Sequence, residues 1–142
     1  MGNFIYRRQL TIEWAYCDPA GIVFNARFFE IFDGGTWALL EAALGVPRHA
    51  LAAAFDIVGV PLVDARARFM APVPFGAHVT LESQVGDIRR SRFAVEHRIV
   101  LDGELMAQGH ETRVWAVWDG DDPGKLRAEP LPDEVLARLR GG

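Results

Sequence analysis

The sequence predicts an α+β fold in which a curved antiparallel sheet of about five strands wraps around one long central helix. The helix is expected over residues 26–44, where apolar side chains recur at helical spacing and cover a wide arc. Strands are expected before and after it, because apolar and polar side chains alternate with a period of two in several segments. Between two such segments, Asp102-Gly103 is a strong signal for a tight hairpin.

The first strand and the long helix come from the N-terminal third of the chain. Residues 4–14 alternate between the two faces of a strand. The helix is expected to end at Gly45, which suits a left-handed cap, because Pro47 cannot continue it. Inside the helix, Gly34-Gly35 costs roughly 1 kcal/mol per glycine relative to alanine. We therefore expect another backbone or a ligand to approach the helix closely there.

The rest of the chain is expected to be mostly strand. A short helix or irregular cover is expected over residues 48–56. The strands that follow share an alternation of apolar and polar side chains and are expected over residues 63–71, 79–86, 93–101 and 105–118. A polar turn over residues 89–92, a polar loop over 119–125 and a last helix from residue 133 complete the chain.

Size, charge and cysteine usage exclude several classes of protein. The 142 residues fit one domain, residues 1–142, with enough buried surface to fold without disulfides. A net charge of −4 leaves no broad basic surface, so we expect no nucleic-acid partner. The single cysteine suits a reducing compartment. The charged N-terminus lacks the apolar core of a signal peptide, and no segment approaches the roughly 18 apolar residues of a membrane span. A soluble, cytoplasmic protein with no membrane partner is expected.

A short stretch brings a carboxylate, a turn and the start of the long helix together. Pro19 biases Asp18 away from the helical region and Gly21 allows the chain to reverse, so Asp18 is expected on a turn. Asn25 is expected as the N-cap or a first-turn residue of the helix, whose first amides lack intrahelical acceptors and favour anions. A fixed carboxylate beside free amides suits acyl transfer, because the carboxylate attacks or activates water while the amides hold the oxyanion.

The same stretch carries a family resemblance. Asp18-Pro19-Ala20-Gly21-Ile22-Val23, followed by Phe28-Phe29-Glu30-Ile31-Phe32-Asp33, resembles the hotdog-fold thioesterases, most closely the 4-hydroxybenzoyl-CoA thioesterase family. The likeness extends to Gly59-Val60-Pro61 before the next strand and to Arg89-Arg90 between two long strands. It implies a hotdog fold and hydrolysis of an acyl-CoA thioester to free acid and CoA. The acyl group is expected to be aromatic, such as hydroxybenzoyl or benzoyl, or short-chain aliphatic.

The resemblance also implies roles for residues. Asp18 would be the nucleophile or the general base, and the backbone amide of Asn25, with Phe24 as a weaker candidate, would be the oxyanion donor. The active sites would lie between subunits of a homodimer or homotetramer. Self-association also agrees with the expected exposed edge strands, which a second copy of the chain can protect by pairing. Coenzyme A is part of the substrate, so no separate cofactor is expected.

Three charged residues are expected to bind substrate. Asp33 lies eight residues after Asn25, a little over two turns along much the same face of the helix. Its carboxylate can accept a hydrogen bond from a hydroxyl on an aromatic acyl group, and capping a neighbouring chain or facing solvent are the alternatives. Arg89 and Arg90 are expected to bind the phosphates of coenzyme A, because guanidinium forks suit phosphates, and a solvated turn is the alternative.

Other reactive side chains are weaker candidates. Cys17 adjoins the turn, but nothing in its surroundings favours a thiolate. His97 falls on the apolar side of its strand and is expected to be a hydrogen-bonded core or interface histidine. One cysteine and no clustered histidines indicate no metal site. Two other functions stay open: an acyl-CoA-binding hotdog protein without turnover, which Asp18 argues against, and a hotdog hydratase, which needs histidine where this chain has Val23.

Overall fold

A five-stranded antiparallel sheet forms the body of the protein, as the alternating segments predict. The computed structural model describes residues 2–142. The strand order is β1-β3-β4-β5-β2, so the first two strands of the chain form the two edges of the sheet. The strands are β1 (Ile5–Thr11), β2 (Leu62–Phe69), β3 (His78–Ile88), β4 (Arg92–Leu101) and β5 (Glu104–Val114).

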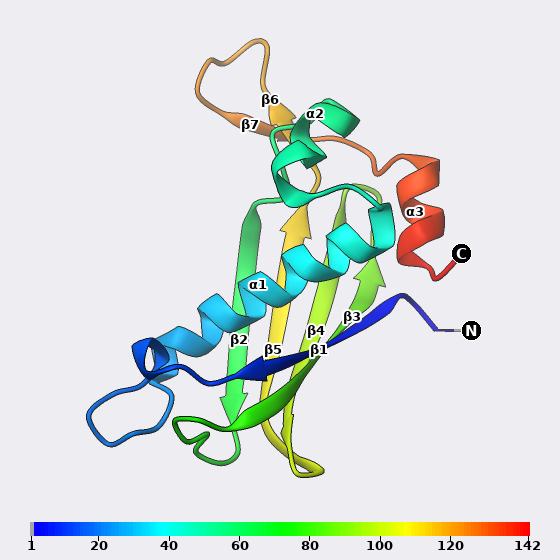
Figure 1. Ribbon diagram of the computed structural model, residues 1–142. Coiled ribbons are helices and arrows are strands. Elements are labelled where there is room, and N and C mark those ends of the chain that lie inside the picture. The colour runs from blue at the N-terminus through cyan, green and yellow to red at the C-terminus, as the bar shows by residue number, and fades with distance from the viewer. Residues whose placement is uncertain (1) are drawn as a thin grey trace.

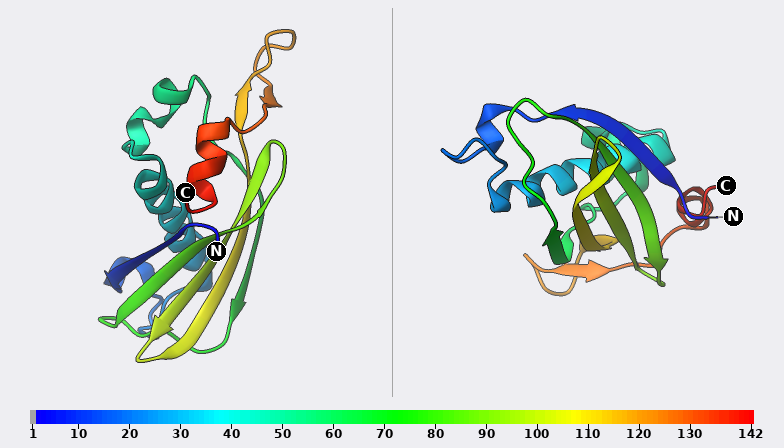
Figure 2. Two further views of the ribbon diagram at one scale, coloured as in Figure 1. Left: turned by 90° about the vertical axis from the view of Figure 1, so that its right-hand side faces the viewer. Right: turned by 90° about the horizontal axis from the view of Figure 1, so that it is seen from below.

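Helix α1 (Asn25–Leu44) lies across the concave face of this sheet, and the sheet curves around it (Figures 1 and 2). It ends where the sequence predicts, because Gly45 adopts the left-handed conformation at φ 70° and its amide donates to the carbonyl of Glu41. The buried side of α1 packs on the sheet and consists of Phe28, Ile31, Phe32, Gly35, Thr36, Ala38, Leu39, Leu40 and Ala43. Its first turn lies at the end of the molecule where β1 and β2 end (Figure 1).

Smaller elements cover the opposite end of the sheet. They are η2 (Arg48–Ala50), α2 (Leu51–Phe55), the hairpin β6 (Ala116–Trp118) with β7 (Leu126–Ala128), and α3 (Asp133–Leu139). Figure 1 shows the β6–β7 hairpin projecting beyond the sheet above β5. Helix α3 starts at Asp133, as predicted for the last helix, and its Val135 and Leu139 are buried.

Two predicted strand boundaries are wrong. The segment 105–118 is not one strand, because β4 begins at Arg92, opposite Val114, and offers no partner beyond that point. From Ala116 the chain pairs with β7 instead. The first strand stops at Thr11, and residues 14–16 form a short 3₁₀ helix, η1, in which Trp14 is 55% exposed rather than inward-facing.

The hairpin prediction is confirmed. Asp102 and Gly103 both have positive φ, 49° and 80°, and they join β4 to β5. The close approach expected at the paired glycines is found at Gly35, where an added Cβ would lie 2.7 Å from Ser83 Oγ.

Within residues 2–142 no single helix is long and apolar enough to span a membrane. Helix α1 and residues 48–55 taken together reach the required length and composition, but the chain bends by 74° between them.

Candidate active site

Asp18 lies on a tight turn whose hydrogen bonds fix both its backbone and its side chain. Its Oδ1 accepts a hydrogen bond from the amide of Ala20 at 2.8 Å. Its amide donates to the carbonyl of Ile22 at 3.0 Å, and its carbonyl accepts from Gly21 at 2.9 Å. Gly21 has φ 80°, a conformation that glycine adopts without strain. In the described part of the chain Oδ2 of Asp18 has no protein partner, so one carboxylate oxygen is fixed and the other is open.

This turn is attached to the neighbouring loop before β3. The amide of Val23 donates to the carbonyl of Val73 at 2.9 Å, and the amide of Phe75 donates to the carbonyl of Gly21 at 2.8 Å. Ile22 also forms an isolated antiparallel bridge with Pro74. Hydrogen bonds from both sides therefore hold the Asp18 turn, as a pre-organised catalytic carboxylate requires.

The turn returns the chain to the start of α1. Cys17 pairs with Val23, and the amide of Phe24 donates to the carbonyl of Tyr16 at 2.9 Å. The amide of Phe24 is therefore occupied, which leaves the amide of Asn25, the first residue of α1, as the better candidate for an oxyanion donor. Amides in the first turn of a helix have no intrahelical acceptor, and among residues 2–142 no other acceptor is found for that of Asn25.

A groove opens beside these amides. It has a volume of about 320 Å³, and its lining includes Asn25, Phe28, Phe69 and Met70. Phe69 and Met70 are nearly half exposed, at 48% and 46%. Apolar walls next to free amide donors suit the acyl end of a thioester better than a charged ligand. The thiol of Cys17 points elsewhere and donates to the carbonyl of Glu13 at 3.6 Å.

Asp33 lies on the same side of α1 as Asn25 and has a partner that sequence reasoning missed. Its Oδ1 accepts a hydrogen bond from Nη2 of Arg113 at 2.6 Å, while its side chain is 51% exposed. Phe29, one turn before Asp33, is 39% exposed. Asn25, Phe29 and Asp33 recur every four residues and so form one stripe along the accessible side of α1.

Arg89 and Arg90 lie in the predicted turn between β3 and β4, and both are exposed. Nε of Arg89 lies 2.8 Å from Oδ2 of Asp87, and the negative charge of Asp87 partly neutralises the Arg89 guanidinium. Strand β3 begins beside the end of β1 and runs to Ile88, so the turn lies about 30 Å from the Asp18 end of the sheet. One chain therefore does not bring the two arginines to the Asp18 turn.

The structure also contains a buried polar cluster in which His97 is the predicted core histidine. His97 is 1% exposed, with Nδ1 2.8 Å from Ser83 Oγ and Nε2 3.1 Å from Thr36 Oγ1. Thr36 donates to Oε1 of Glu111, and Arg113 donates to the same oxygen through Nε at 3.2 Å and Nη2 at 3.0 Å. The expectation that His97 is satisfied by hydrogen bonds is confirmed.

The electrostatics of Glu111 follow from this cluster. Burial raises the pKa of its carboxyl group, but hydrogen bonds from His97 and Thr36 and the charge of Arg113 outweigh burial and hold the pKa below its ordinary value of 4.5. Glu111 and Arg113 were missed as candidates although the sequence carried a signal. Both fall on the inward-facing positions of β5, where charged residues need partners.

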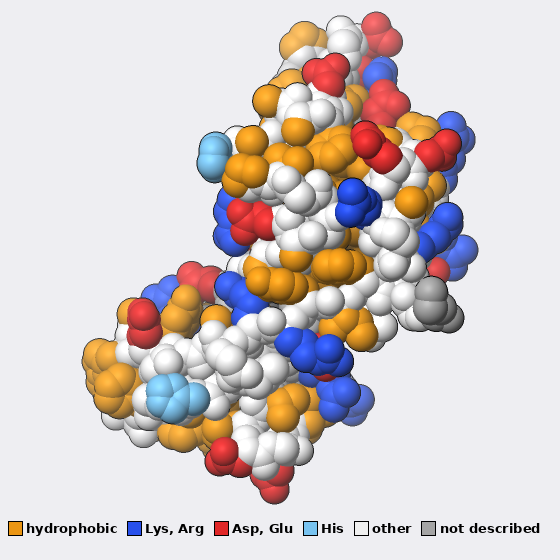
Figure 3. Space-filling view, turned by 45° about the vertical axis from the view of Figure 1, so that its right-hand side comes forward, with side chains coloured by type: hydrophobic (Ala, Val, Ile, Leu, Met, Phe, Trp, Pro, Cys, Tyr) orange, Lys and Arg blue, Asp and Glu red, His pale blue; other side chains and the backbone are white. Residues whose placement is uncertain are grey.

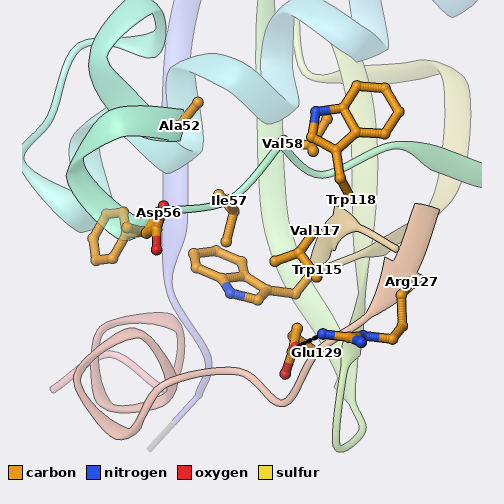
Figure 4. A pocket seen from close by; sticks show the side chains of 10 residues that line it. Ala52, Asp56, Ile57, Val58, Trp115, Val117, Trp118, Arg127 and Glu129 are labelled. Carbon is orange, nitrogen blue, oxygen red and sulfur yellow. Dashed lines mark hydrogen bonds and ion pairs between the residues drawn. The ribbon is translucent and has the colours of Figure 1, made fainter. Parts of the chain in front are cut away.

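A cavity of about 800 Å³ lies at the other end of the molecule, between α2 and the β6–β7 hairpin. Figure 4 shows Trp115 and Ile57 within it and the ion pair of Arg127 with Glu129 at its edge. None of the predicted site residues lines it. Size alone does not make this cavity the active site. Its carboxylates are those of Asp56 and of Glu129, which is paired with Arg127, and neither lies at the start of a long helix as the Asp18 turn does.

Comparison with known proteins shows the family of the chain. The sequence profile of the thioesterase-like superfamily matches residues 12–139. The chain belongs to this superfamily. The resemblance to the hotdog thioesterases of the 4-hydroxybenzoyl-CoA thioesterase family is confirmed, as is the hotdog fold.

Individual relatives in this superfamily match most of the chain. It is 28% identical over 133 residues to 4-hydroxybenzoyl-CoA thioesterase of Pseudomonas sp. strain CBS-3, covering 90% of this chain and 92% of that protein. The solved structure of that thioesterase gives a TM-score of 0.84 at 27% identity, covering 94% of this chain and 98% of the other. A 1,4-dihydroxy-2-naphthoyl-CoA hydrolase of Synechococcus elongatus is 29% identical over 94 residues, 66% of this chain and 68% of that protein. The protein is accordingly a thioester hydrolase.

Proposed function

We propose that this thioesterase hydrolyses an acyl-CoA in which the acyl group is a compact aromatic ring that carries a hydroxyl. The observation that carries the proposal is the fixed carboxylate of Asp18 on a turn that leads directly into α1, whose first amide, that of Asn25, has no acceptor among residues 2–142. Two matched relatives support the substrate class, because the names of both denote hydroxylated aromatic acyl-CoA esters. The proposed chemistry uses only groups of the protein and water, and coenzyme A enters as part of the substrate.

Asp18 acts through its open oxygen. As a nucleophile, Oδ2 attacks the thioester carbonyl carbon, the C–S bond breaks, the thiolate of coenzyme A leaves and takes up a proton, and water then opens the anhydride. As a general base, Oδ2 instead takes a proton from the water that attacks the same carbon. In both routes the amide of Asn25 donates a hydrogen bond to the oxyanion. This hydrogen bond stabilises the oxyanion most where water is excluded.

The stripe along α1 that starts at Asn25, on the wall of the groove, is the proposed acyl site. Asn25 and Asp33 are separated by about 12 Å along the helix axis at 1.5 Å per residue. A benzoyl group with a hydroxyl opposite the carbonyl, with a hydrogen bond at each end, spans a distance of this size. The exposed ring of Phe29 lies between the two ends and offers a face for aromatic packing.

The phosphates of coenzyme A are proposed to bind Arg89 and Arg90 of a second subunit, since one chain holds these arginines far from Asp18. Self-association as a homodimer or homotetramer is supported by the two edge strands, each with one unpaired side. On β2 the side chains of Leu62, Val63 and Phe69 are exposed, at 45%, 58% and 48%. Figure 3 shows hydrophobic side chains gathered in patches on the face that it views. Sedimentation at micromolar concentration should show a dimer or tetramer, and a monomer alone would contradict a shared site.

Thiol release from a panel of CoA esters tests the activity. The panel contains 4-hydroxybenzoyl-, benzoyl-, phenylacetyl- and short aliphatic CoA, and the hydroxylated ester should be the best substrate. Asp18→Asn should lower kcat by roughly a thousandfold or more while the protein folds and binds substrate, because the amide neither attacks nor takes a proton. Cys17→Ser is the matched control and should keep most of the activity. An inactive Cys17→Ser with an active Asp18→Asn would overturn the assignment, and an inactive wild type would overturn the function.

A further inference from the structure

Asp33 is the surface end of a hydrogen-bonded chain that runs through the core. The chain starts at Ser83 on β3, passes through His97 on β4, and reaches Glu111 on β5 both directly, at 3.5 Å, and through Thr36 of α1. Ser83, His97, Glu111 and Thr36 are each 3% exposed or less. Arg113 then joins Glu111 to Asp33.

Arg113 is held in one orientation by three different partners. Its Nε and Nη2 donate to Glu111, its Nη1 donates to the carbonyl of Val60 at 3.3 Å, and its Nη2 also donates to Asp33 at 2.6 Å. Its side chain is 4% exposed. A planar guanidinium with fixed donors cannot turn while these contacts remain. The position of Oδ1 of Asp33 is therefore set by the sheet and not by the rotamer preference of an exposed side chain.

The other oxygen of Asp33 remains open. In the described part of the chain no protein donor reaches Oδ2, and the side chain is half exposed. Glu111, which anchors Arg113, is itself fixed by Thr36 and His97, and the ring of Phe32 stacks on His97 at 5.1 Å. The arrangement differs from an ordinary surface ion pair, in which both partners are mobile and solvated.

We propose that Arg113 is a positioning residue that makes the enzyme select acyl groups with a hydroxyl, because it fixes Asp33 so that the open oxygen meets the hydroxyl hydrogen. The inference rests on the proposed function and concerns the specificity of the same site. A site built to accept a hydroxyl disfavours the analogue that lacks one, since its polar group is then left without a partner when substrate excludes water. A pre-fixed acceptor strengthens this selection, because no side-chain freedom is lost on binding.

The test compares two esters that differ by one hydroxyl, 4-hydroxybenzoyl-CoA and benzoyl-CoA. Arg113→Lys keeps the charge and the apolar stem, but one ammonium group cannot hold Glu111, the Val60 carbonyl and Asp33 together. The ratio of kcat/KM for the hydroxylated over the unsubstituted ester should fall by about tenfold, the effect of one charge-assisted hydrogen bond. The matched control is Arg98→Lys, which changes a half-exposed arginine on the outer face of β4 and should leave the ratio unchanged.

A second background separates positioning from a structural role. In Asp33→Ala the ratio should already be low, and adding Arg113→Lys should not lower it further, because Arg113 acts through Asp33. An Arg113→Lys enzyme that loses activity equally on both esters, or keeps the wild-type ratio, overturns the inference while leaving the proposed function intact. A wild type that hydrolyses neither ester overturns the proposed function and, with it, the positioning role of Arg113.

A variant further from the surface covers the case in which Arg113→Lys does not fold, as judged by circular dichroism. Thr36→Val replaces the hydroxyl that donates to Glu111 by a methyl group. It should lower the same ratio by a smaller factor, about threefold, without contacting substrate. An unchanged ratio in folded Thr36→Val would then overturn the inference.

Discussion

The two adjacent glycines of α1 should respond in opposite ways to the same substitution. At Gly35 an added Cβ would lie 2.7 Å from Ser83 Oγ, 2.8 Å from Leu81 Cδ2 and 3.2 Å from His97 Cε1. At Gly34 it would meet only the flexible tip of Arg8, at 3.6 Å. Both residues have ordinary helical φ, so the difference between the sites is one of space alone.

The magnitudes follow from two opposing effects. Overpacking a well-filled core costs about 1–3 kcal/mol, whereas alanine gains up to about 1 kcal/mol over glycine inside a helix. Gly34→Ala should therefore stabilise the protein by about 0.5–1 kcal/mol. Gly35→Ala should destabilise it by about 1–2 kcal/mol, since the Ser83–His97 hydrogen bond must also shift.

Thermal unfolding followed by circular dichroism measures both changes side by side. With about 3 °C per kcal/mol for a domain of this size, Tm should rise by about 1.5–3 °C in Gly34→Ala and fall by about 3–6 °C in Gly35→Ala. Urea midpoints with unchanged slopes would show that stability itself has changed. A Gly35→Ala protein as stable as the wild type would refute the argument that the sheet requires glycine there.

Two further predictions concern charged groups. Replacing Arg89 and Arg90 together by alanine should raise KM for a CoA ester several-fold and leave kcat nearly unchanged, because contacts to phosphates far from the thioester stabilise the ground state and the transition state alike. If the KM of the wild type stayed the same across a range of salt concentrations, phosphate binding by these arginines would be contradicted. The folded-state pKa of Glu111 lies below 4.5, so its carboxylate contributes stability that is complete above that pH and is lost as the pH falls through the folded value. The free energy of unfolding of the wild type should therefore drop more steeply below pH 4.5 than that of Glu111→Gln, and parallel curves from acid denaturation would count against this contribution.

Local chemistry made the Asp18 turn predictable from the sequence. Asp18, Pro19 and Gly21 determine a turn through their own backbone preferences, and Asn25 opens a helix whose apolar period is long and regular. The hairpin at Asp102-Gly103 was predictable for the same reason, since positive φ is needed at both positions. Such features depend on residues close together in the chain.

Features that depend on distant partners were not predictable. The strand expected over 105–118 alternates without interruption, and only the position at which β4 begins causes the break after Val114. The contact between Asp33 and Arg113 joins residues 80 apart in sequence, so no local pattern pairs them. Charged residues at the inward positions of β5 indicated a buried cluster, but not which side chains complete it.

The strand order also bears on how the fold assembles. Strands β3, β4 and β5 follow one another through short turns and can pair locally. In contrast, paired residues of β1 and β3 are 67 to 79 apart in sequence, and those of β2 and β5 are 38 to 51 apart. We therefore expect the edge strands to be added after the meander, because the entropy lost on closing these long loops opposes their pairing. The Asp18 turn follows β1 in the chain and is hydrogen-bonded to residues 73–75, which follow β2. The part of the molecule that carries Asp18, the proposed catalytic carboxylate, is thus expected to be complete only when both edge strands have docked, so a folding intermediate that keeps most of the sheet should be inactive.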